Sequence, residues 1–268
     1  MPDKGGFPHY MLKEIFEQPQ GLRDTIAHRV SLEEGLIRLP EVRIGVDELR
    51  AVRRINIVAS GTSRHAGMAG QYMIQELANL PADVDYASEF EYRNPMIGRG
   101  ELTIVITQSG ETADTTAAQR EAKSKGSRTV AISNVVGSTI AREADGVLYT
   151  YAGPEISIAS TKAFTAQMAV LFLFAAYLGQ VRGNLRHDEL RKYIRELLEL
   201  PSKTEGVLQC APDCKRLAAQ YHAVQDFLFL GRAIHYPIAM DGALKLKEVS
   251  YIHAEGYPRA RPSTAPMR

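Results

Sequence analysis

Apolar residues along the chain alternate between short β-branched runs and longer stretches with helical spacing, beginning near Val46. Segments with helical periodicity separate the short runs, which are typical of buried strands. The expected strands are 54–59, 83–87, 102–106, 129–132 and 146–149, and the expected helices are 63–79, 88–92 and 111–124. This alternation predicts an α/β fold, a doubly wound parallel sheet with helices on both faces in a three-layer αβα sandwich.

The segments on either side of this core are mainly helical. An entry helix at 11–16 is stopped by Pro19, and a second follows at 22–29. Further helices are expected at 161–180, 187–199 and 212–223, and a strand at 227–230 with a helix at 237–250 repeats the opening of the sheet.

Four regions follow from this pattern. They are a linker with entry helices (1–45), a first sheet domain (46–183), connecting helices with the start of a second, similar unit (184–258), and an aberrant tail (259–268). One strand and one helix cannot bury both faces of a second sheet, so apolar surface at 227–230 is expected to remain exposed and prone to aggregation.

Composition excludes several classes of function. The 268 residues are 45% hydrophobic and 24% charged, and 32 basic against 31 acidic residues leave a net charge of +1. Scattered basic residues and a near-neutral charge argue against nucleic-acid binding. The longest apolar stretch, 168–178, is shorter than the roughly 20 residues of a bilayer span, and no signal pattern is visible, so no membrane association is expected.

Cys210 and Cys214 are the only two cysteines. A C-x-x-x-C pair could hold a metal or form a disulfide, but no second pair or histidine cluster accompanies it. Two reduced structural thiols in a cytoplasmic protein are therefore favoured, and neither a metal nor another cofactor is expected.

Two loops rich in hydroxyl side chains and glycine carry the candidate chemistry. Ser60-Gly61-Thr62-Ser63 follows the strand at 54–59, and Thr107-Gln108-Ser109-Gly110-Glu111-Thr112 follows the strand at 102–106. A loop between a parallel strand and a helix presents free N–H groups and the positive end of the helix dipole, which favour a phosphate. One such loop is more often a turn with a helix cap, but two in the same context indicate a site for a phosphorylated small molecule such as a sugar phosphate.

These two loops resemble those of the sugar isomerase (SIS) domain. Three further segments narrow the resemblance to the isomerase half of the glucosamine-6-phosphate synthase family: an entry segment from Asp3 to Pro19, Glu155 to Thr165, and Ala243 to Glu255. Ala87 to Arg93 fits the same family, and the resemblance extends over residues 3–258. It implies conversion of fructose 6-phosphate and glutamine-derived ammonia to glucosamine 6-phosphate by a homodimer.

The resemblance also implies site residues. Thr107, Gln108, Ser109, Thr112 and Ser63 would hold the phosphate. Ser60, Gly61 and Thr62 would line the sugar, with Ile158, Ala159 and Ser160 on its other side. Ser60 is a departure, because the family usually has cysteine there.

Lys245 and Glu248 are the candidate catalytic pair. Their i, i+3 spacing places them on one helix face, where an exposed ion pair is the simpler interpretation. Aldose–ketose interconversion needs a base to move a proton between C1 and C2, and the family motif favours Glu248 as that base with Lys245 stabilising the developing charge. Lys247 is expected off that face, and His253 is as compatible with a structural role as with catalysis.

Three departures from the family bear on activity. By this resemblance we expect the chain to lack the glutaminase half and the remainder of the second unit with its C-terminal lysine, and the match ends at Pro258 before a family histidine. We therefore expect little or no synthase activity from this chain alone, and a frameshift is one hypothesis for residues 259–268. The alternatives are a non-catalytic sugar-phosphate-binding module and a chain that does not fold stably.

Overall fold

The computed structural model describes residues 3–259, and the predicted tail lies outside them from residue 260 onward. The chain divides into two compact units, Met1–Gln209 and Cys210–Arg268. Unit 1 holds the predicted parallel sheet, and each unit is described by itself below.

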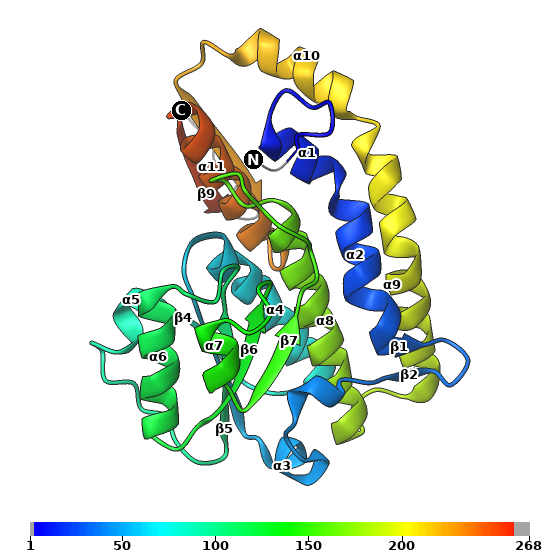
Figure 1. The fold of residues 1–268 in the computed structure, drawn as a ribbon, viewed down its shortest axis with the longest axis vertical. Coiled ribbons are helices and arrows are strands. Elements are labelled where there is room, and N and C mark those ends of the chain that lie inside the picture. The colour runs from blue at the N-terminus through cyan, green and yellow to red at the C-terminus, as the bar shows by residue number, and fades with distance from the viewer. Residues whose placement is uncertain (1–2, 260–268) are drawn as a thin grey trace, which may run out of the picture. The chain divides into compact units, whose positions relative to one another are not determined.

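The sheet of unit 1 has five parallel strands in the order β4-β3-β5-β6-β7 (Figure 1). Its strands are β3 (Arg54–Ala59), β4 (Ala82–Tyr86), β5 (Glu101–Ile106), β6 (Arg128–Ser133) and β7 (Gly146–Tyr149). Strand β4 lies on one side of β3, and β5, β6 and β7 follow on the other side. The order of the strands therefore reverses between β4 and β5, as in a doubly wound sheet. The predicted α/β sandwich is confirmed.

Side-chain alternation along these strands builds two cores. Ile55 and Ile57 of β3 point to one face of the sheet and contribute to the larger core. Val58, the next residue, points to the other face and contributes to the smaller core. Helices α4 (Gly61–Ala78) and α8 (Lys162–Arg182) cover the first face. Helices α5 (Ala87–Phe90), α6 (Ala113–Ser124) and α7 (Thr139–Glu143) cover the second.

Close packing of α4 against α8 depends on small residues. A Cβ at Gly70 would lie 2.8 Å from Leu171 Cδ2, so a larger side chain would push the two helices apart. Helix α8 is buried over most of its circumference and is the one described helix that is long and apolar enough to cross a membrane. Because 67% of its most apolar window is buried inside the protein, it has the character of a core helix.

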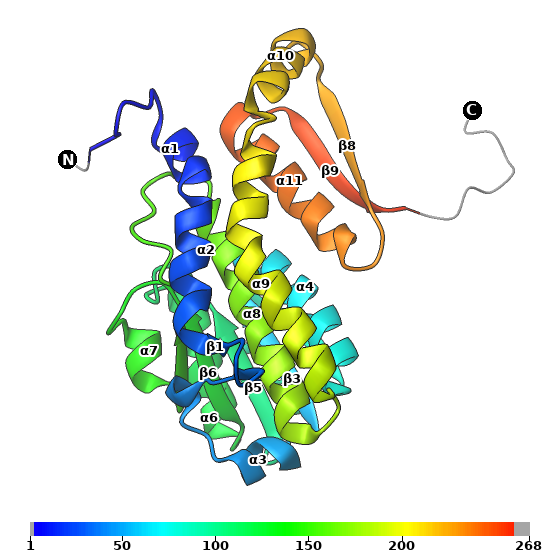
Figure 2. The same ribbon diagram turned by 90° about the vertical axis from the view of Figure 1, so that its right-hand side faces the viewer.

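The entry segment packs onto this core. It contains α1 (Tyr10–Phe16), α2 (Gln18–Ile26), η1 (Ala27–Arg29), β1 (Val30–Ser31), β2 (Leu36–Ile37) and η2 (Pro40–Val42), and α3 (Val46–Ala51) follows it. Pro19 lies in the first turn of α2, where its missing N–H has no cost. Figure 2 shows α2 and α8 running beside α9 (His187–Leu208), which is longer than predicted because Pro201 is accommodated inside it.

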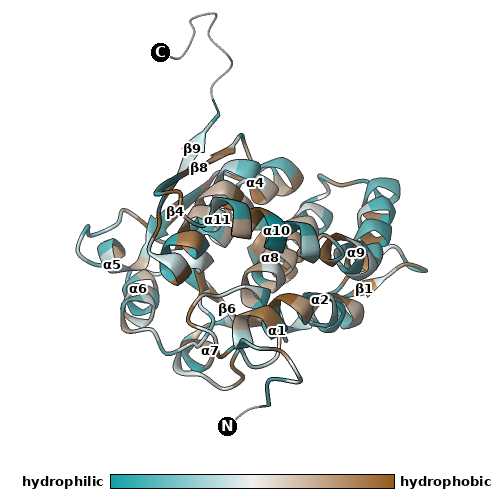
Figure 3. Ribbon diagram, turned by 90° about the horizontal axis from the view of Figure 1, so that it is seen from above, coloured by the Kyte–Doolittle hydropathy of each residue, from teal (hydrophilic) through white to brown (hydrophobic). Residues whose placement is uncertain are grey.

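Unit 2 contains more sheet than the sequence predicts. After α10 (Ala211–Tyr221) come β8 (Asp226–Gly231), α11 (His235–Ser250) and β9 (His253–Pro258). The prediction of a lone strand at 227–230 is wrong, because β9 pairs with β8 in parallel from Asp226↔His253 to Gly231↔Pro258. In Figure 3, β8 is largely brown (hydrophobic) and β9 is pale to teal (more polar). A search for apolar runs in the sequence therefore finds only β8. The expected exposure remains at Leu228 and Leu230, which are 67% and 60% exposed.

Candidate functional site

The two hydroxyl-rich loops lie at the same edge of the sheet. Strands β3 and β5 are hydrogen-bonded neighbours, with Ala59 opposite Ile106 at their carboxyl ends. The loops that follow these residues therefore start side by side, as the sequence predicts.

The first loop is the entry to α4. Ser60 is the N-cap residue, and its side chain makes no capping hydrogen bond to the helix. Gly61 has a positive φ of 52°, which a side chain would strain. Thr62 is buried, and Ser63 Oγ accepts a hydrogen bond of 3.0 Å from Gln167 Nε2 on α8.

The second loop is held by its own hydroxyl groups. Thr107 is buried, and its Oγ1 accepts the Gly110 N–H at 3.1 Å and lies 3.4 Å from Thr112 Oγ1. Ser109 Oγ accepts the Glu111 N–H at 3.3 Å. Thr112 is the N-cap residue of α6 and, like Ser60, makes no side-chain capping bond.

This arrangement suits an anion. In any α-helix the first-turn N–H groups point out of the helix end, and the N-cap side chains of α4 and α6 make no hydrogen bond to them. Both helices therefore begin, with their positive ends, after neighbouring strands at the same edge of the sheet, in loops rich in hydroxyl groups. The carboxylate of Glu111, in the same loop, is bonded to the start of α7: it accepts the Thr139 N–H at 2.8 Å, and this hydrogen bond lowers the pKa of Glu111.

Residues 155–161 form the loop that leads into α8. Glu155 organises it, because its carboxylate accepts hydrogen bonds from the Ser160 hydroxyl at 2.8 Å and from the Thr161 and Ala163 N–H groups at 2.8 and 3.2 Å. Ile158 is 98% exposed, and Ala159 is buried.

Carboxylates of the entry helices hold this loop in place through hydrogen bonds and an ion pair. Buried Glu14 on α1 accepts the Ile156 N–H at 2.6 Å and also the Ser157 N–H and hydroxyl. Glu17 pairs with buried Lys162 Nζ at 2.7 Å. Sequence reasoning missed Glu14, Glu17 and Glu155 as site-shaping residues, since each is one carboxylate without a spacing pattern.

Asn134, at the end of β6, links the second loop to the end of β7. Its backbone N–H donates to Gln108 O at 3.2 Å, and its side-chain Oδ1 accepts the Thr150 hydroxyl and the Ala152 N–H at 2.8 and 2.9 Å. The edge of the sheet is thus one hydrogen-bonded framework running from the second loop toward residue 153.

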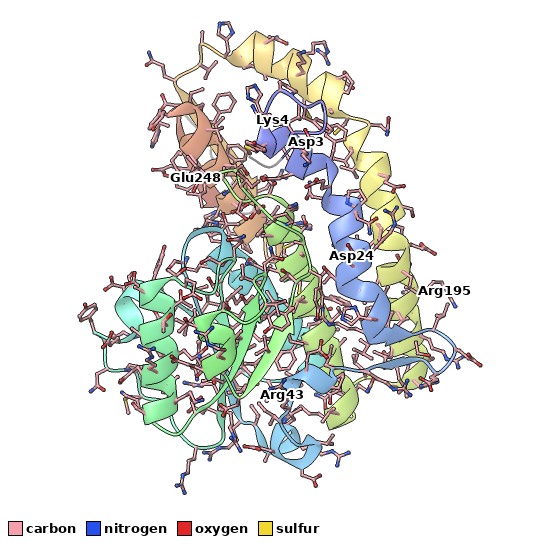
Figure 4. All side chains as sticks on the ribbon, viewed as in Figure 1. Asp3, Lys4, Asp24, Arg43, Arg195 and Glu248 are labelled. Atoms are coloured by element: carbon pink, nitrogen blue, oxygen red, sulfur yellow. The ribbon has the colours of Figure 1, made fainter. Side chains whose placement is uncertain are left out.

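Unit 2 carries the candidate catalytic pair on α11. Lys245 Nζ lies 2.8 Å from Glu248 Oε2, with both side chains partly exposed, so the predicted shared face is confirmed. Figure 4 labels Glu248 on this helix. Lys247 is exposed, also as predicted.

His253, the first residue of β9, has an acidic partner at each ring nitrogen. Asp226 Oδ1 lies 2.8 Å from Nδ1 and Glu255 Oε1 lies 3.3 Å from Nε2. The hydrogen bond to Asp226 is the main cause of a raised His253 pKa, with Glu255 adding to it. The contact with Asp226 joins the first residue of β9 to the first residue of β8.

A cavity of about 660 Å³ beside β3 and β4 is a competing site in unit 1. Its arginines are already engaged, because Arg54 and Arg93 pair with Asp83 and Asp85, and Arg64 stacks on Tyr86 with its guanidinium 3.7 Å from the ring centroid. This mixed and largely neutralised lining is a poorer phosphate site than the two helix ends.

The structure thus places all eleven predicted binding residues in unit 1, eight on one feature and three on another. Those features are the sheet edge (Ser60, Gly61, Thr62, Ser63, Thr107, Gln108, Ser109, Thr112) and the 155–161 loop (Ile158, Ala159, Ser160). Lys245 and Glu248 lie in unit 2.

Comparison with known proteins identifies the family. The SIS domain family matches residues 48–177. The chain is 49% identical over 255 residues to glutamine–fructose-6-phosphate aminotransferase (isomerizing) of Clostridium tetani and 51% identical over 265 residues to that of Chlorobaculum tepidum. These alignments cover 95% and 99% of this chain but 42% and 43% of the relatives, so the chain spans about two fifths of their length.

A solved structure gives the same result. The C-terminal domain of glucosamine-fructose-6-phosphate aminotransferase from Francisella tularensis superposes with a TM-score of 0.91 at 40% identity, covering 96% of this chain and 72% of that one. The chain therefore belongs to the SIS-domain family, and within it to the C-terminal SIS part of the glutamine–fructose-6-phosphate aminotransferases.

Proposed function

We propose that this chain binds fructose 6-phosphate and carries the ketose–aldose step that, with ammonia, gives glucosamine 6-phosphate as one part of a longer enzyme. The observation that carries the proposal is that two hydroxyl-rich loops follow neighbouring strands, β3 and β5, and lead into helices α4 and α6, whose N-cap residues make no side-chain cap. From the family resemblance we also propose a homodimer in the cytoplasm, which sedimentation and cell fractionation would test.

The phosphate is assigned to the second loop. Hydroxyl groups of Thr107, Ser109 and Thr112 and the amide of Gln108 would surround it, together with Ser63 from the first loop. A phosphate dianion accepts several hydrogen bonds at once, and the positive ends of α4 and α6 stabilise its charge without a lysine.

The sugar is assigned to the space beside that phosphate. Ser60, Gly61 and Thr62 would line one side, where Gly61 leaves room because nothing lies within 4 Å of a Cβ placed there. The other side would be Ile158, Ala159 and Ser160, on the loop that Glu155 organises.

Glu248 is proposed as the base and Lys245 as its partner. Ammonia would replace the C2 carbonyl oxygen as an imine with loss of water. Glu248 would then take a proton from C1 and return it to C2 while the C1 hydroxyl proton passes to the imine nitrogen, so that C1 becomes an aldehyde and C2 carries an amine. The Lys245 ammonium, 2.8 Å from the carboxylate, would stabilise the negative charge that develops between C1 and C2.

Binding is tested by thermal unfolding in buffer without phosphate or sulfate. Fructose 6-phosphate at 100 times its dissociation constant should stabilise the chain by about 2.7 kcal/mol, and fructose without the phosphate should not. The Ser109→Ala variant should lose most of this shift, whereas Ser202→Ala, on the exposed side of α9, should keep it. An equal shift in both variants would contradict the phosphate assignment.

Catalysis is tested by exchange of sugar protons with deuterated water, followed by NMR. Glu248→Gln should bind fructose 6-phosphate but exchange no C1 proton, and Lys247→Gln should behave as the unaltered chain. Binding without exchange in the unaltered chain would support the sugar-phosphate-binding module instead.

A further inference from the structure

Two thiols face each other where α10 begins. Cys210 is the N-cap residue and Cys214 lies in the first turn, and their Sγ atoms are 3.9 Å apart. Both cysteines are free and exposed. That the thiols are reduced stays a prediction. Their exposure gives them no role in packing, and the proposed sugar-phosphate site uses no residue of α10.

Their separation distinguishes between two kinds of thiol chemistry. A disulfide needs sulfurs about 2.05 Å apart and Cβ atoms about 3.5–4.5 Å apart, whereas i, i+4 residues on a helix have Cβ atoms roughly 5–6 Å apart. Closing the bond would therefore distort the first turn. Two thiolates bound at about 2.3 Å to one tetrahedral ion lie about 3.8 Å apart, which matches the observed 3.9 Å with no movement of the helix.

We propose that Cys210 and Cys214 form a bidentate thiolate site for one thiophilic divalent ion of the Zn²⁺ and Cd²⁺ class. Binding exchanges two S–H bonds for two sulfur–metal bonds and releases two protons to solvent, so no oxidant or reductant takes part. The two thiols supply half of a tetrahedral shell.

Solvent supplies the other half. Among the described residues, no group of three or more His, Cys, Asp or Glu side chains could hold a metal. Asp213, the nearest carboxylate in sequence, pairs with Arg216 at 3.4 Å and is 73% exposed. The site is therefore open, and water or a small thiol would occupy the remaining two positions.

Protons compete with the ion at this site. In the metal-free chain the hydrogen bond with Cys210 raises the pKa of the Cys214 thiol, and the nearby charge of Asp213 acts in the same direction. Both thiol protons must therefore leave before the two sulfurs can bind the ion.

Titration of the reduced, chelator-treated chain with Cd²⁺ tests the site, because thiolate ligands give an ultraviolet charge-transfer absorption. We expect one Cd²⁺ per chain, with the absorption saturating at that ratio, and displacement of Cd²⁺ by excess Zn²⁺. Cys210→Ser and Cys214→Ser should each weaken binding on the order of 100-fold, since each removes the gain from holding the second ligand in place.

His222→Ala is the matched control. His222 is an exposed potential ligand just after α10, and its removal should leave the titration unchanged. Circular dichroism of each variant should match the unaltered chain, because α10 contributes no buried residue. Absence of the absorption in the unaltered chain, a single cysteine variant that binds as tightly, or half an ion per chain would each overturn a site within one chain.

Discussion

Gly110 passes so close to Ser138 that a Cβ on the glycine would collide with the serine side chain. The contact joins the second hydroxyl-rich loop to the start of α7, and Gly110 also has a φ of 71°. Gly137 has nearly the same φ, 72°, but nothing lies within 4 Å of its Cβ position.

Gly110→Ala should therefore cost more than Gly137→Ala. The positive φ alone should cost about 1 kcal/mol in Gly137→Ala, and the added collision should bring Gly110→Ala to about 2–4 kcal/mol. Urea unfolding of the two variants measures the difference. Equal losses would show that the loop moves away from Ser138 without penalty.

Glu155→Ala should loosen the loop that leads into α8. The change leaves the Ser160 hydroxyl and the Thr161 and Ala163 N–H groups without their acceptor, for a cost of about 1–3 kcal/mol. Amide hydrogen exchange should accelerate at Thr161 and Ala163. Glu89→Ala, at an exposed position on α5, should leave those two amides protected as before, and unchanged exchange in Glu155→Ala would remove its assigned role.

Arg29→Met should destabilise unit 1 despite keeping the side-chain volume. The buried guanidinium donates to Glu41 at 2.8 Å, to Thr25 O at 2.9 Å and to Tyr149 O at 2.7 Å. Removing it leaves a carboxylate and two carbonyls unpaired, with an expected loss of about 3 kcal/mol in chemical unfolding. Arg38→Met breaks only an exposed pair with Glu34 and should stay within about 0.5 kcal/mol of the unaltered chain.

His253 should titrate above its ordinary pKa of 6.5, because Asp226 and then Glu255 favour its charged form. The resulting stabilisation is complete below pH 6.5 and is lost as the pH rises through the folded-state pKa. NMR titration should give His253 a pKa above 6.5. It should give His28 a pKa below 6.5, because burial is the main cause of the lowered pKa of His28. Asp226→Asn should lower the His253 pKa only, and a change at both histidines would point to a global effect instead.

Local patterns predicted the sheet well. The runs ending at Ala59 and Ile106 are buried strands flanked by helix-forming segments, so burial, periodicity and loop chemistry agree there, and both loops could be placed at one sheet edge. The pairing of Lys245 with Glu248 followed in the same way from helical spacing.

Features that depend on long-range contacts were not predicted. Strand β9 is polar along most of its length, and only its parallel pairing with β8 makes it a strand. Glu14 and Glu17 resemble ordinary exposed carboxylates of an amphipathic helix. Their partners lie 142 to 145 residues further along the chain, beyond any local pattern.

That separation has a consequence for the order in which the protein is made. At about 5–20 residues per second, a ribosome needs roughly 7–30 s to travel from Glu14 to Ser157. During that interval Glu14 and Glu17 have already been synthesised, whereas their partners at Ile156 and Lys162 have not. The sheet edge can form from partners much closer in sequence, so among the predicted binding residues of unit 1, those of the 155–161 loop wait longest on translation.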